Sequence, residues 1–299
     1  LVGEKYGCIK DVRIKQEHKQ SSVKLYIDTE IENLTGNDLR MECVITDPDG
    51  VNTIVKTDQP KQHNSAVCVI LNPKLWHVRG FGKQYLYEVK VKLLCKGEVI
   101  DKKKLKIGLR TIEVSRQKDN IGEEFCFKVN GTKIFAMGAN YIPEDNLLGR
   151  RSRERTEKLL RNCAAANYNM IRVWGGGFYP DDYFYDICDE LGLLVWQDMM
   201  FACSVYDGND PEFCATVEQE LIDNVRRIDH HACLAMWCGN NEMETQYETL
   251  AWQKSKKQTY DYIHLYEYII PKIVKEEDPE KFYWPSSPSS GGNYENSNA

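Results

Sequence analysis

Polar side chains directly follow several apolar segments of this sequence, and the most informative case is WCGNNE at residues 237–242. Glu242 comes just after an apolar run, where a carboxylate costs free energy unless it has partners or a catalytic task. A carboxylic acid that protonates a leaving oxygen and later deprotonates a water is the general acid/base that hydrolysis of a glycosidic bond requires. On these residues alone a second interpretation stays open: Asn240 and Asn241 cap the following turn, and Glu242 is solvated.

Similar polar groups, together with an aromatic side chain, follow three other apolar segments. Amides, a guanidinium group and carboxylates bind sugar hydroxyls, and a tryptophan covers the apolar face of a sugar ring. The candidate substrate-binding residues are Asn140, Arg172, Trp174, Asp198 and Asn241. Three of them also have a structural interpretation: a salt bridge inside the fold for Arg172, core packing for Trp174, and a loop cap for Asp198.

The elements that must position these residues are strands and helices that alternate along residues 112–299. We expect apolar strands at 133–138, 169–174, 193–197, 233–237 and 282–284. We expect helices at 152–166, 182–191, 211–229 and 260–275. This alternation is typical of a parallel sheet covered by helices. The glycines at 175–177 lack the spacing of a dinucleotide fingerprint and a P-loop lysine. We therefore expect a (β/α)8 TIM barrel, whose functional groups lie at the carboxyl ends of its strands.

Residues 1–111 have a different pattern, in which apolar and polar side chains alternate. Strands are expected at 23–28, 41–46, 66–70, 85–91 and 105–107, with turn residues between them. Short strands at this spacing predict a β-sandwich of immunoglobulin type. The predicted domains are thus an immunoglobulin-like β-sandwich at 1–111 and the N-terminal portion of a TIM-barrel catalytic domain at 112–299.

Charge and cysteine content exclude several classes of function. The formal net charge of the chain is -6. Residues 1–111 are basic, whereas residues 112–299 are acidic. The lysines follow alternating strands, as on a solvated sheet face, so we expect no nucleic-acid partner. No apolar run reaches the roughly 18 residues that would span a membrane. The 11 cysteines include no C-x-x-C pair, which favours reduced core residues in a cytoplasmic protein. No cluster has metal-ligand spacing, so we expect no metal and no cofactor.

Three segments closely resemble glycoside hydrolase family 2, and within it the β-mannosidases. They are VNGTKIFAMGANYIP at 129–143, NMIRVWGGGFYPDDYFYDICDELGLLVWQDMMFAC at 169–203 and AMWCGNNE at 235–242. Residues 72–91 and 108–114 resemble the region where the family's immunoglobulin-like middle domain runs into its barrel. RVWGGG at 172–177 differs from the histidine-proline type of motif in β-galactosidases and β-glucuronidases. WCGNNE differs from exo-glucosaminidases, which have Gly-Ser-Asp before the acid.

The resemblance implies a retaining exo-glycosidase that hydrolyses terminal β-D-mannosyl residues of β-mannosides. It makes Glu242 the acid/base, and it places Asn241, Arg172, Trp174 and Asp198 against the mannosyl unit. The implied partner is a small carbohydrate, namely a β-mannoside, a mannooligosaccharide or an N-glycan core. The alternatives are another family 2 hydrolase (endo-β-mannosidase or exo-β-glucosaminidase) and a non-catalytic carbohydrate-binding fragment.

A retaining mechanism needs a second carboxylate, about 5–5.5 Å from the first. The resemblance places this nucleophile on a strand well beyond Glu242. Glu295 is the only acid in residues 284–299 and no strand precedes it, so we do not assign it as the nucleophile. A complete barrel takes about 250 residues, more than 112–299 supply. We therefore expect a barrel truncated after about five strands, a nucleophile beyond residue 299, and no turnover by this chain alone.

Overall fold

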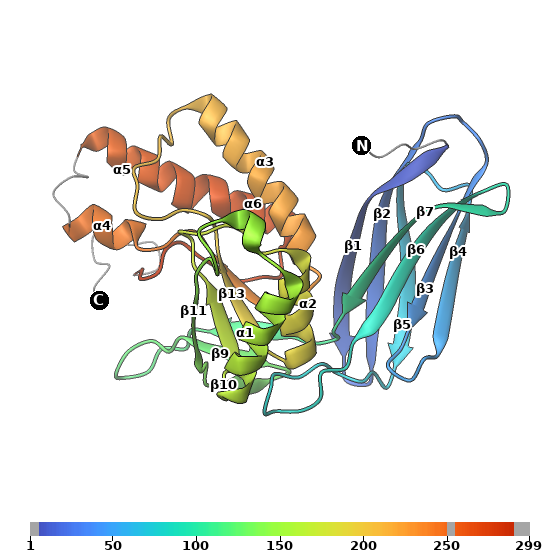
Figure 1. Ribbon diagram of the computed structural model, residues 1–299, viewed down its shortest axis with the longest axis horizontal. Coiled ribbons are helices and arrows are strands. Elements are labelled where there is room, and N and C mark those ends of the chain that lie inside the picture. Colours follow the sequence, from blue (N-terminus) through green and yellow to red (C-terminus); the bar gives the residue numbers. More distant parts are fainter. Residues whose placement is uncertain (1–5, 250–254, 290–299) are drawn as a thin grey trace. The chain divides into compact units, whose positions relative to one another are not determined.

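The computed structural model describes residues 6–249 and 255–289, which form two compact units (Figure 1). The first unit comprises Leu1–His77, Gly82–Thr111 and His230–Ala232. The second comprises Val78–Phe81, Ile112–Asp229 and Cys233–Ala299. The main division along the chain therefore lies between Thr111 and Ile112, and each unit has a hydrophobic core of its own.

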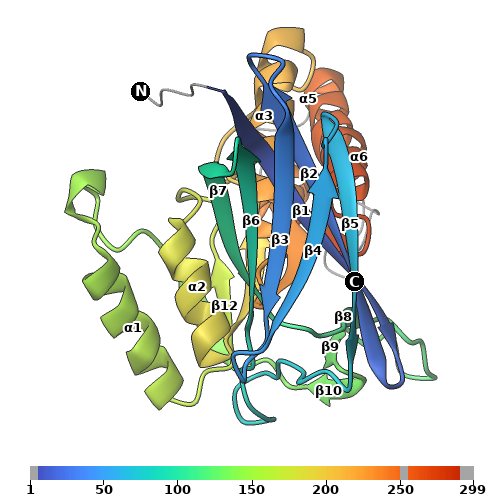
Figure 2. The same ribbon diagram turned by 90° about the vertical axis from the view of Figure 1, so that its right-hand side faces the viewer.

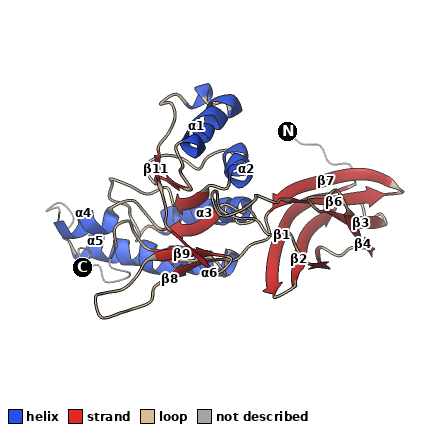
Figure 3. Cartoon of the chain, turned by 90° about the horizontal axis from the view of Figure 1, so that it is seen from below, coloured by secondary structure: helices blue, strands red, loops and turns tan. Residues whose placement is uncertain are grey.

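Two antiparallel sheets make up the first unit. One has three strands in the order β1 (Gly7–Lys19), β2 (Ser22–Asn33) and β5 (His63–Leu71). The other has four strands in the order β4 (Asn52–Asp58), β3 (Leu39–Thr46), β6 (Tyr87–Cys95) and β7 (Glu98–Ile107). Figure 2 shows β3 between β4 and β6. Among its described residues this unit contains strands and turns but no helix (Figure 3).

The two sheets pack against each other through the buried side chains that alternate along their strands. Val23, Leu25 and Ile27 of β2 share one buried core with Val89 and Val91 of β6, because alternate side chains of a strand point to the same face. The five strands expected from the sequence lie within or overlap β2, β3, β5, β6 and β7. The prediction missed β1 and β4. β1 carries charged residues through most of its length, and the side chains of edge strand β4 are mostly exposed, so its apolar alternation is weak.

A five-stranded parallel sheet forms the centre of the second unit. Its strands lie in chain order: β11 (Gly138–Tyr141), β12 (Met170–Val173), β13 (Leu194–Asp198), β14 (Leu234–Cys238) and β15 (Tyr283–Trp284). The first three connections contain the 3-10 helix η1 (Leu148–Arg150) with α1 (Arg153–Ala165), then α2 (Asp182–Leu191), then α3 (Pro211–Ile228). The fourth contains α4 (Met243–Thr249), α5 (Lys256–Tyr262), the π-helix η2 (Ile263–Ile269) and α6 (Ile270–Glu277). The expected alternation of parallel strands and helices is therefore present.

Local signals set the ends of the first three helices. The Ser152 hydroxyl accepts a hydrogen bond from the Arg155 N–H and caps α1, and Asp210 caps α3 in the same way. Gly192 ends α2 in the left-handed region, with φ of 74°. Each of these three predicted helices agrees with the observed one to within a residue.

Two predicted elements are wrong in their boundaries. The strand expected at 133–138 is two strands, β10 (Thr132–Ile134) and β11, because the chain changes sheets between them. Ile134 pairs with β9 (Cys126–Val129), whereas Gly138 pairs with Met170 of β12. The helix expected at 260–275 already begins at Lys256, where a capping box starts α5, and its middle is the π-helix η2.

The two faces of the parallel sheet have different coverings. Ile171, Val173 and Val195 point toward the helices and pack with them in one core. On the opposite face the rings of Phe125 and Phe127 lie near the Trp196 ring, with centroids 5.9 and 6.4 Å away. Phe127 belongs to a small antiparallel sheet in the order β10, β9 and β8 (Ile112–Ser115). Arg172, Trp196 and Asp198 alternate with the helix-facing apolar residues along β12 and β13, so their side chains lie on the face opposite the helices.

Candidate active site

Strand register brings the predicted site residues to one edge of the parallel sheet. Asn140 of β11 pairs with Arg172 of β12, and Arg172 pairs with Trp196 of β13. Asp198 ends β13 two residues later and shares the face of Trp196. The residue between them, Gln197, faces the helices and accepts a 2.7 Å hydrogen bond from the hydroxyl of Tyr185 in α2. Parallel strands end at a common edge, so side chains from different strands meet there.

The guanidinium group of Arg172 binds three of the other five predicted site residues. Its Nη1 donates to Asn140 Oδ1 at 3.0 Å, and its Nη2 donates to Asn241 Oδ1 at 2.9 Å. Nη2 also donates to Asp198 Oδ2 at 2.7 Å, and Nε donates to Asp198 Oδ1 at 3.3 Å. The Arg172 side chain is 17% exposed and that of Asp198 is fully buried. The salt bridge proposed as the structural alternative for Arg172 is therefore present. The same guanidinium group also binds Asn140 and Asn241, two of the predicted sugar-binding residues.

Asp198 is a buried carboxylate with hydrogen-bond donors on both oxygens. Besides Arg172, the Trp196 Nε1–H donates to its Oδ1 at 3.0 Å and the Gly175 N–H donates to its Oδ2 at 3.1 Å. Burial raises the pKa of Asp198 from its ordinary 3.8 to about 6, against the opposing effect of Arg172 and of these hydrogen bonds. The Asp198 carboxyl group therefore gains its negative charge near pH 6, where the folded protein can be studied.

Asp198 should make stability depend on pH. The folded protein holds this proton more tightly than the unfolded chain does, so the contribution of Asp198 is full below about pH 4 and is lost as the pH rises toward 6. Between pH 5 and pH 7 the free energy of unfolding of wild type should fall by about 1 kcal/mol relative to Asp198→Asn. Unfolding midpoints at the two pH values measure this, with Asp223→Asn on α3 as the control for losing one negative charge. Parallel pH profiles for wild type and Asp198→Asn would contradict the assignment.

Two glycines set the position of Trp174 and of the loop after β12. A Cβ at Gly175 would lie 2.6 Å from Met199 O and 2.8 Å from Phe201 O, so only glycine lets this N–H reach Asp198. A Cβ at Gly176 would lie 1.9–2.4 Å from ring carbons of Trp174, which places the partly buried indole directly over that glycine. Trp174 therefore has a packed support beside the Arg172 network, although it is outside the network's hydrogen bonds.

The segment after β14 gives its three polar residues different surroundings. Asn240 is fully buried and its Oδ1 accepts a 3.0 Å hydrogen bond from the Met243 N–H, so it caps the turn, as the second interpretation expects. The Asn241 side chain instead accepts from Arg172. Glu242 is exposed and has a φ of 61°, an uncommon conformation for a residue other than glycine. Glu242 thus directly follows the network residue Asn241 in the chain, on a backbone held in an unusual conformation.

Trp196 and Ser286 also belong to this region, although neither is predicted as a site residue from the sequence. Trp196 donates to Asp198, and its position two residues earlier on the same strand was the signal that could have revealed it. Ser286 is fully buried and donates to Asn240 Oδ1 at 2.6 Å. It lies after β15, and local sequence carries no signal for that contact. Glu295, which we left unassigned, lies outside the described residues.

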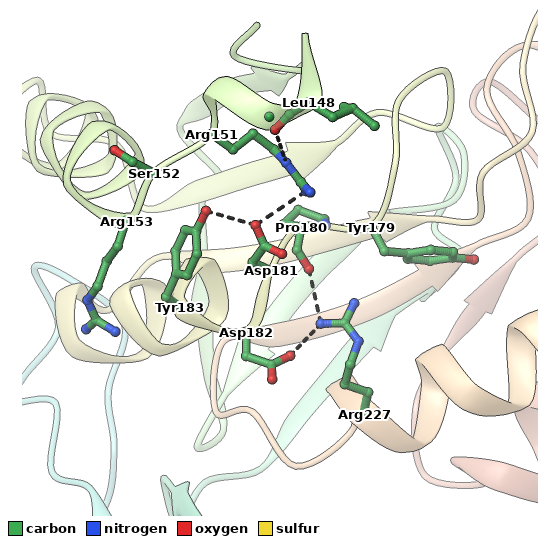
Figure 4. A pocket seen from close by; sticks show the side chains of 11 residues that line it. Leu148, Arg151, Ser152, Arg153, Tyr179, Pro180, Asp181, Asp182, Tyr183 and Arg227 are labelled. Atoms are coloured by element: carbon green, nitrogen blue, oxygen red, sulfur yellow. Dashed lines mark hydrogen bonds and ion pairs between the residues drawn. The ribbon is translucent and has the colours of Figure 1, made fainter. Parts of the chain in front are cut away.

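An open depression of about 850 Å³ lies elsewhere on the second unit, around the first turns of α1 and α2 (Figure 4). Two of its arginines pair with two of its aspartates. Arg151 lies 3.3 Å from Asp181, and Arg227 lies 2.6 Å from Asp182. None of the predicted site residues lines it, so we assign no function to this depression.

Two classes of site are not found in the part of the chain that the structure describes. No group of three or more His, Cys, Asp or Glu side chains is placed to hold a metal ion there. In the same residues, no helix combines the length and the apolar character needed to cross a membrane.

Comparison with known proteins gives one family match and several similar proteins. The model of the family "Glycosyl hydrolases family 2" matches residues 8–110. "Beta-mannosidase B" of Aspergillus clavatus is 35% identical over 308 residues, which cover 94% of this chain and 34% of that protein. The crystal structure of a β-D-mannosidase from Dictyoglomus thermophilum is 35% identical with a TM-score of 0.89, covering 98% of this chain and 36% of that one.

A more distant structure shares the fold. The β-glucuronidase of Parabacteroides merdae has a TM-score of 0.78 at 15% identity, covering 93% of this chain and 34% of that one. The chain spans about a third of the length of the curated relatives that it matches. The family model matches residues 8–110, and the two mannosidases at 35% identity align with nearly all of this chain. The chain is therefore similar to members of glycosyl hydrolase family 2.

Proposed function

We propose that the full-length protein carrying residues 1–299 is a retaining exo-β-mannosidase, which removes terminal β-D-mannosyl residues from β-mannosides. One observation carries the proposal: Arg172, paired with the buried Asp198, hydrogen-bonds both Asn140 of β11 and Asn241 after β14, and Asn241 directly precedes the exposed Glu242. The similarity to two β-mannosidases at 35% identity supports the choice of sugar. The substrate would be a β-mannoside, a mannooligosaccharide or an N-glycan core.

In this proposal Glu242 is the general acid/base. Its proton passes to the glycosidic oxygen while the bond from that oxygen to the anomeric carbon breaks, and a nucleophilic carboxylate takes the sugar. Glu242 then removes a proton from the water that releases mannose. Asn140, Asn241 and Asp198 bind sugar hydroxyls, and Trp174 packs on the ring. The nucleophile would be a second carboxylate outside residues 1–299, on a later strand, as the resemblance to the family implies.

The domain assignment belongs to the same proposal. Residues 1–111 would be an immunoglobulin-like β-sandwich, which two antiparallel sheets around a common core support. Residues 112–299 would be the N-terminal portion of a (β/α)8 barrel, which the chain order of the five parallel strands supports. A cytoplasmic location would suit the 11 cysteines, none of which forms a disulfide.

A panel of aryl glycosides tests the proposal. The full-length protein should hydrolyse a p-nitrophenyl β-mannoside with kcat/KM at least about 10²-fold above the matching β-glucoside, β-galactoside, β-glucuronide and β-glucosaminide. Nuclear magnetic resonance of the first product should show β-mannose, the retained configuration. Preference for the β-glucosaminide would select the exo-β-glucosaminidase alternative. Mannose binding without any turnover would make the site a carbohydrate-binding one.

Moving Trp174 without removing it should impair the same reaction. Gly176→Ala places a methyl group where the indole ring now lies, so the ring must shift by an ångström or more. We expect kcat/KM on the β-mannoside to fall by about 10- to 100-fold, because small displacements of positioning groups are costly. Gly122→Ala is the control, since a Cβ at that glycine meets nothing within 4 Å. Normal activity of Gly176→Ala would mean that Trp174 serves the fold rather than the sugar.

A further inference from the structure

The backbone of Glu242 is held by the segment that follows β15. The Glu242 N–H donates to Ser287 O at 3.1 Å, and the Ser287 N–H donates to Asn240 O at 3.1 Å. On its other side, the Glu242 carbonyl accepts from the Gln246 N–H in α4 at 2.9 Å. Because φ at Glu242 is 61°, the direction of its side chain depends on these contacts keeping an unfavourable conformation in place.

A buried pair of side chains fastens the two segments together. Asn240 Nδ2 donates to Pro285 O at 2.9 Å, while Asn240 Oδ1 accepts from the Ser286 hydroxyl at 2.6 Å and from the Met243 N–H at 3.0 Å. The Ser286 oxygen also accepts from the Glu244 N–H at 3.4 Å. Asn240 and Ser286 are both fully buried. Together they satisfy backbone donors of the first turn of α4, directly after Glu242.

We call the Asn240–Ser286 pair the clamp, and close packing around it restricts its movement. A Cβ at Gly239 would lie 2.4 Å from Pro285 O and 2.3 Å from the Tyr283 hydroxyl, so the two segments approach as closely as glycine allows. The Tyr283 hydroxyl is itself held by a 2.7 Å hydrogen bond to Tyr266 O. The segment after β15 therefore has a fixed position from which it can hold Glu242.

We infer that Asn240 and Ser286 are positioning residues for Glu242, a role that rests on the function proposed above. The clamp sets the backbone of Glu242 so that its carboxyl group points at the glycosidic oxygen. Loosening the clamp leaves the carboxyl group chemically intact but misdirected. Proton donation then suffers, while sugar binding by Arg172 and its partners is retained.

The test separates acid assistance from folding by comparing two substrates on each variant of the full-length protein. A 2,4-dinitrophenyl β-mannoside has a good leaving group and needs little protonation, whereas β-1,4-mannobiose needs it fully. We define the ratio as kcat/KM for the dinitrophenyl mannoside divided by kcat/KM for mannobiose. This ratio does not depend on how much of the protein is folded. Ser286→Ala should raise this ratio by about 10-fold, and Asn240→Ala should raise it by more, because general acid catalysis contributes about 10²–10⁴-fold in total.

A matched variant and a double variant complete the experiment. Ser115→Ala removes another buried serine hydroxyl, one that bonds Glu124, and should leave the ratio within about twofold of wild type. The double variant Asn240→Ala/Ser286→Ala should resemble Asn240→Ala alone, because residues of one clamp are not additive.

The outcomes distinguish this inference from the proposed function. If Glu242→Gln raises the ratio and neither clamp variant does, the clamp is only structural and the inference is wrong. If wild type cleaves neither mannoside, the proposed function fails and the inference falls with it. A raised ratio in Ser286→Ala, with KM for mannobiose close to wild type, supports positioning.

Discussion

Glu242→Gln in the full-length protein is expected to lower kcat/KM for β-1,4-mannobiose by about 10²–10⁴-fold, the usual contribution of a general acid. An activated aryl β-mannoside should behave differently, because its leaving group departs without protonation. Its kcat/KM should stay near wild type, while kcat and KM fall together because release of the sugar from the enzyme has lost its base. Azide needs no base to attack, so it should restore turnover of the aryl substrate and yield β-mannosyl azide.

Glu218→Gln is the matched control for Glu242→Gln. It changes an exposed glutamate on α3 in the same way and should leave both substrates unaffected. Unchanged hydrolysis of mannobiose by Glu242→Gln would make Glu242 an ordinary solvated acid at the start of α4. A uniform loss on both substrates without azide rescue would point to a binding role instead.

Arg172→Met is expected to damage both stability and activity, and the two losses can be separated. It leaves the fully buried Asp198 without its counter-ion, and breaking a buried ion pair in this way costs about 3–5 kcal/mol. The unfolding midpoint should fall by roughly 10 °C. Removal of the guanidinium also releases Asn140 and Asn241. We expect kcat/KM on an aryl β-mannoside to fall at least about 10²-fold.

A second substitution tells the two losses apart. In Arg172→Met/Asp198→Asn the buried charge is gone, so much of the stability should return while activity stays low. Arg226→Met is the matched control: Arg226 also binds a carboxylate through two nitrogens, those of Glu277, but its side chain is 40% exposed. It should cost about 1 kcal/mol or less. An Arg172→Met protein as stable as the Arg226→Met protein would show that Asp198 has no need of its partner.

Much of the second unit was predictable because its signals are local. Ser152, Asp210 and Gly192 act on backbone groups within a few residues, so the helix ends follow from sequence alone. The apolar segments before Arg172 and Asp198 predicted β12 and β13 for the same reason. The prediction failed where a non-local partner decides, as between Ile134 and Gly138, which belong to different sheets.

The division of roles within the site could not be read from the sequence. Asn240 and Asn241 are neighbours of the same type, yet one is buried against Pro285 and Ser286 and the other binds Arg172. The difference arises because successive residues after a strand point in different directions, and each meets whatever the fold has placed there. Ser286 entered the site only through such a contact.

By itself the sequence determined which chemical groups stand at the ends of its strands, because residue type and short-range pattern fix both. The tertiary structure decided which of these groups meet. Arg172 reaches Asp198, Asn140 and Asn241 across 26, 32 and 69 residues of chain. Those contacts depend on strand order, on register and on a buried environment that raises the pKa of Asp198 to about 6. None of these is a property of any short segment, because each arises only when distant segments pack together and exclude water.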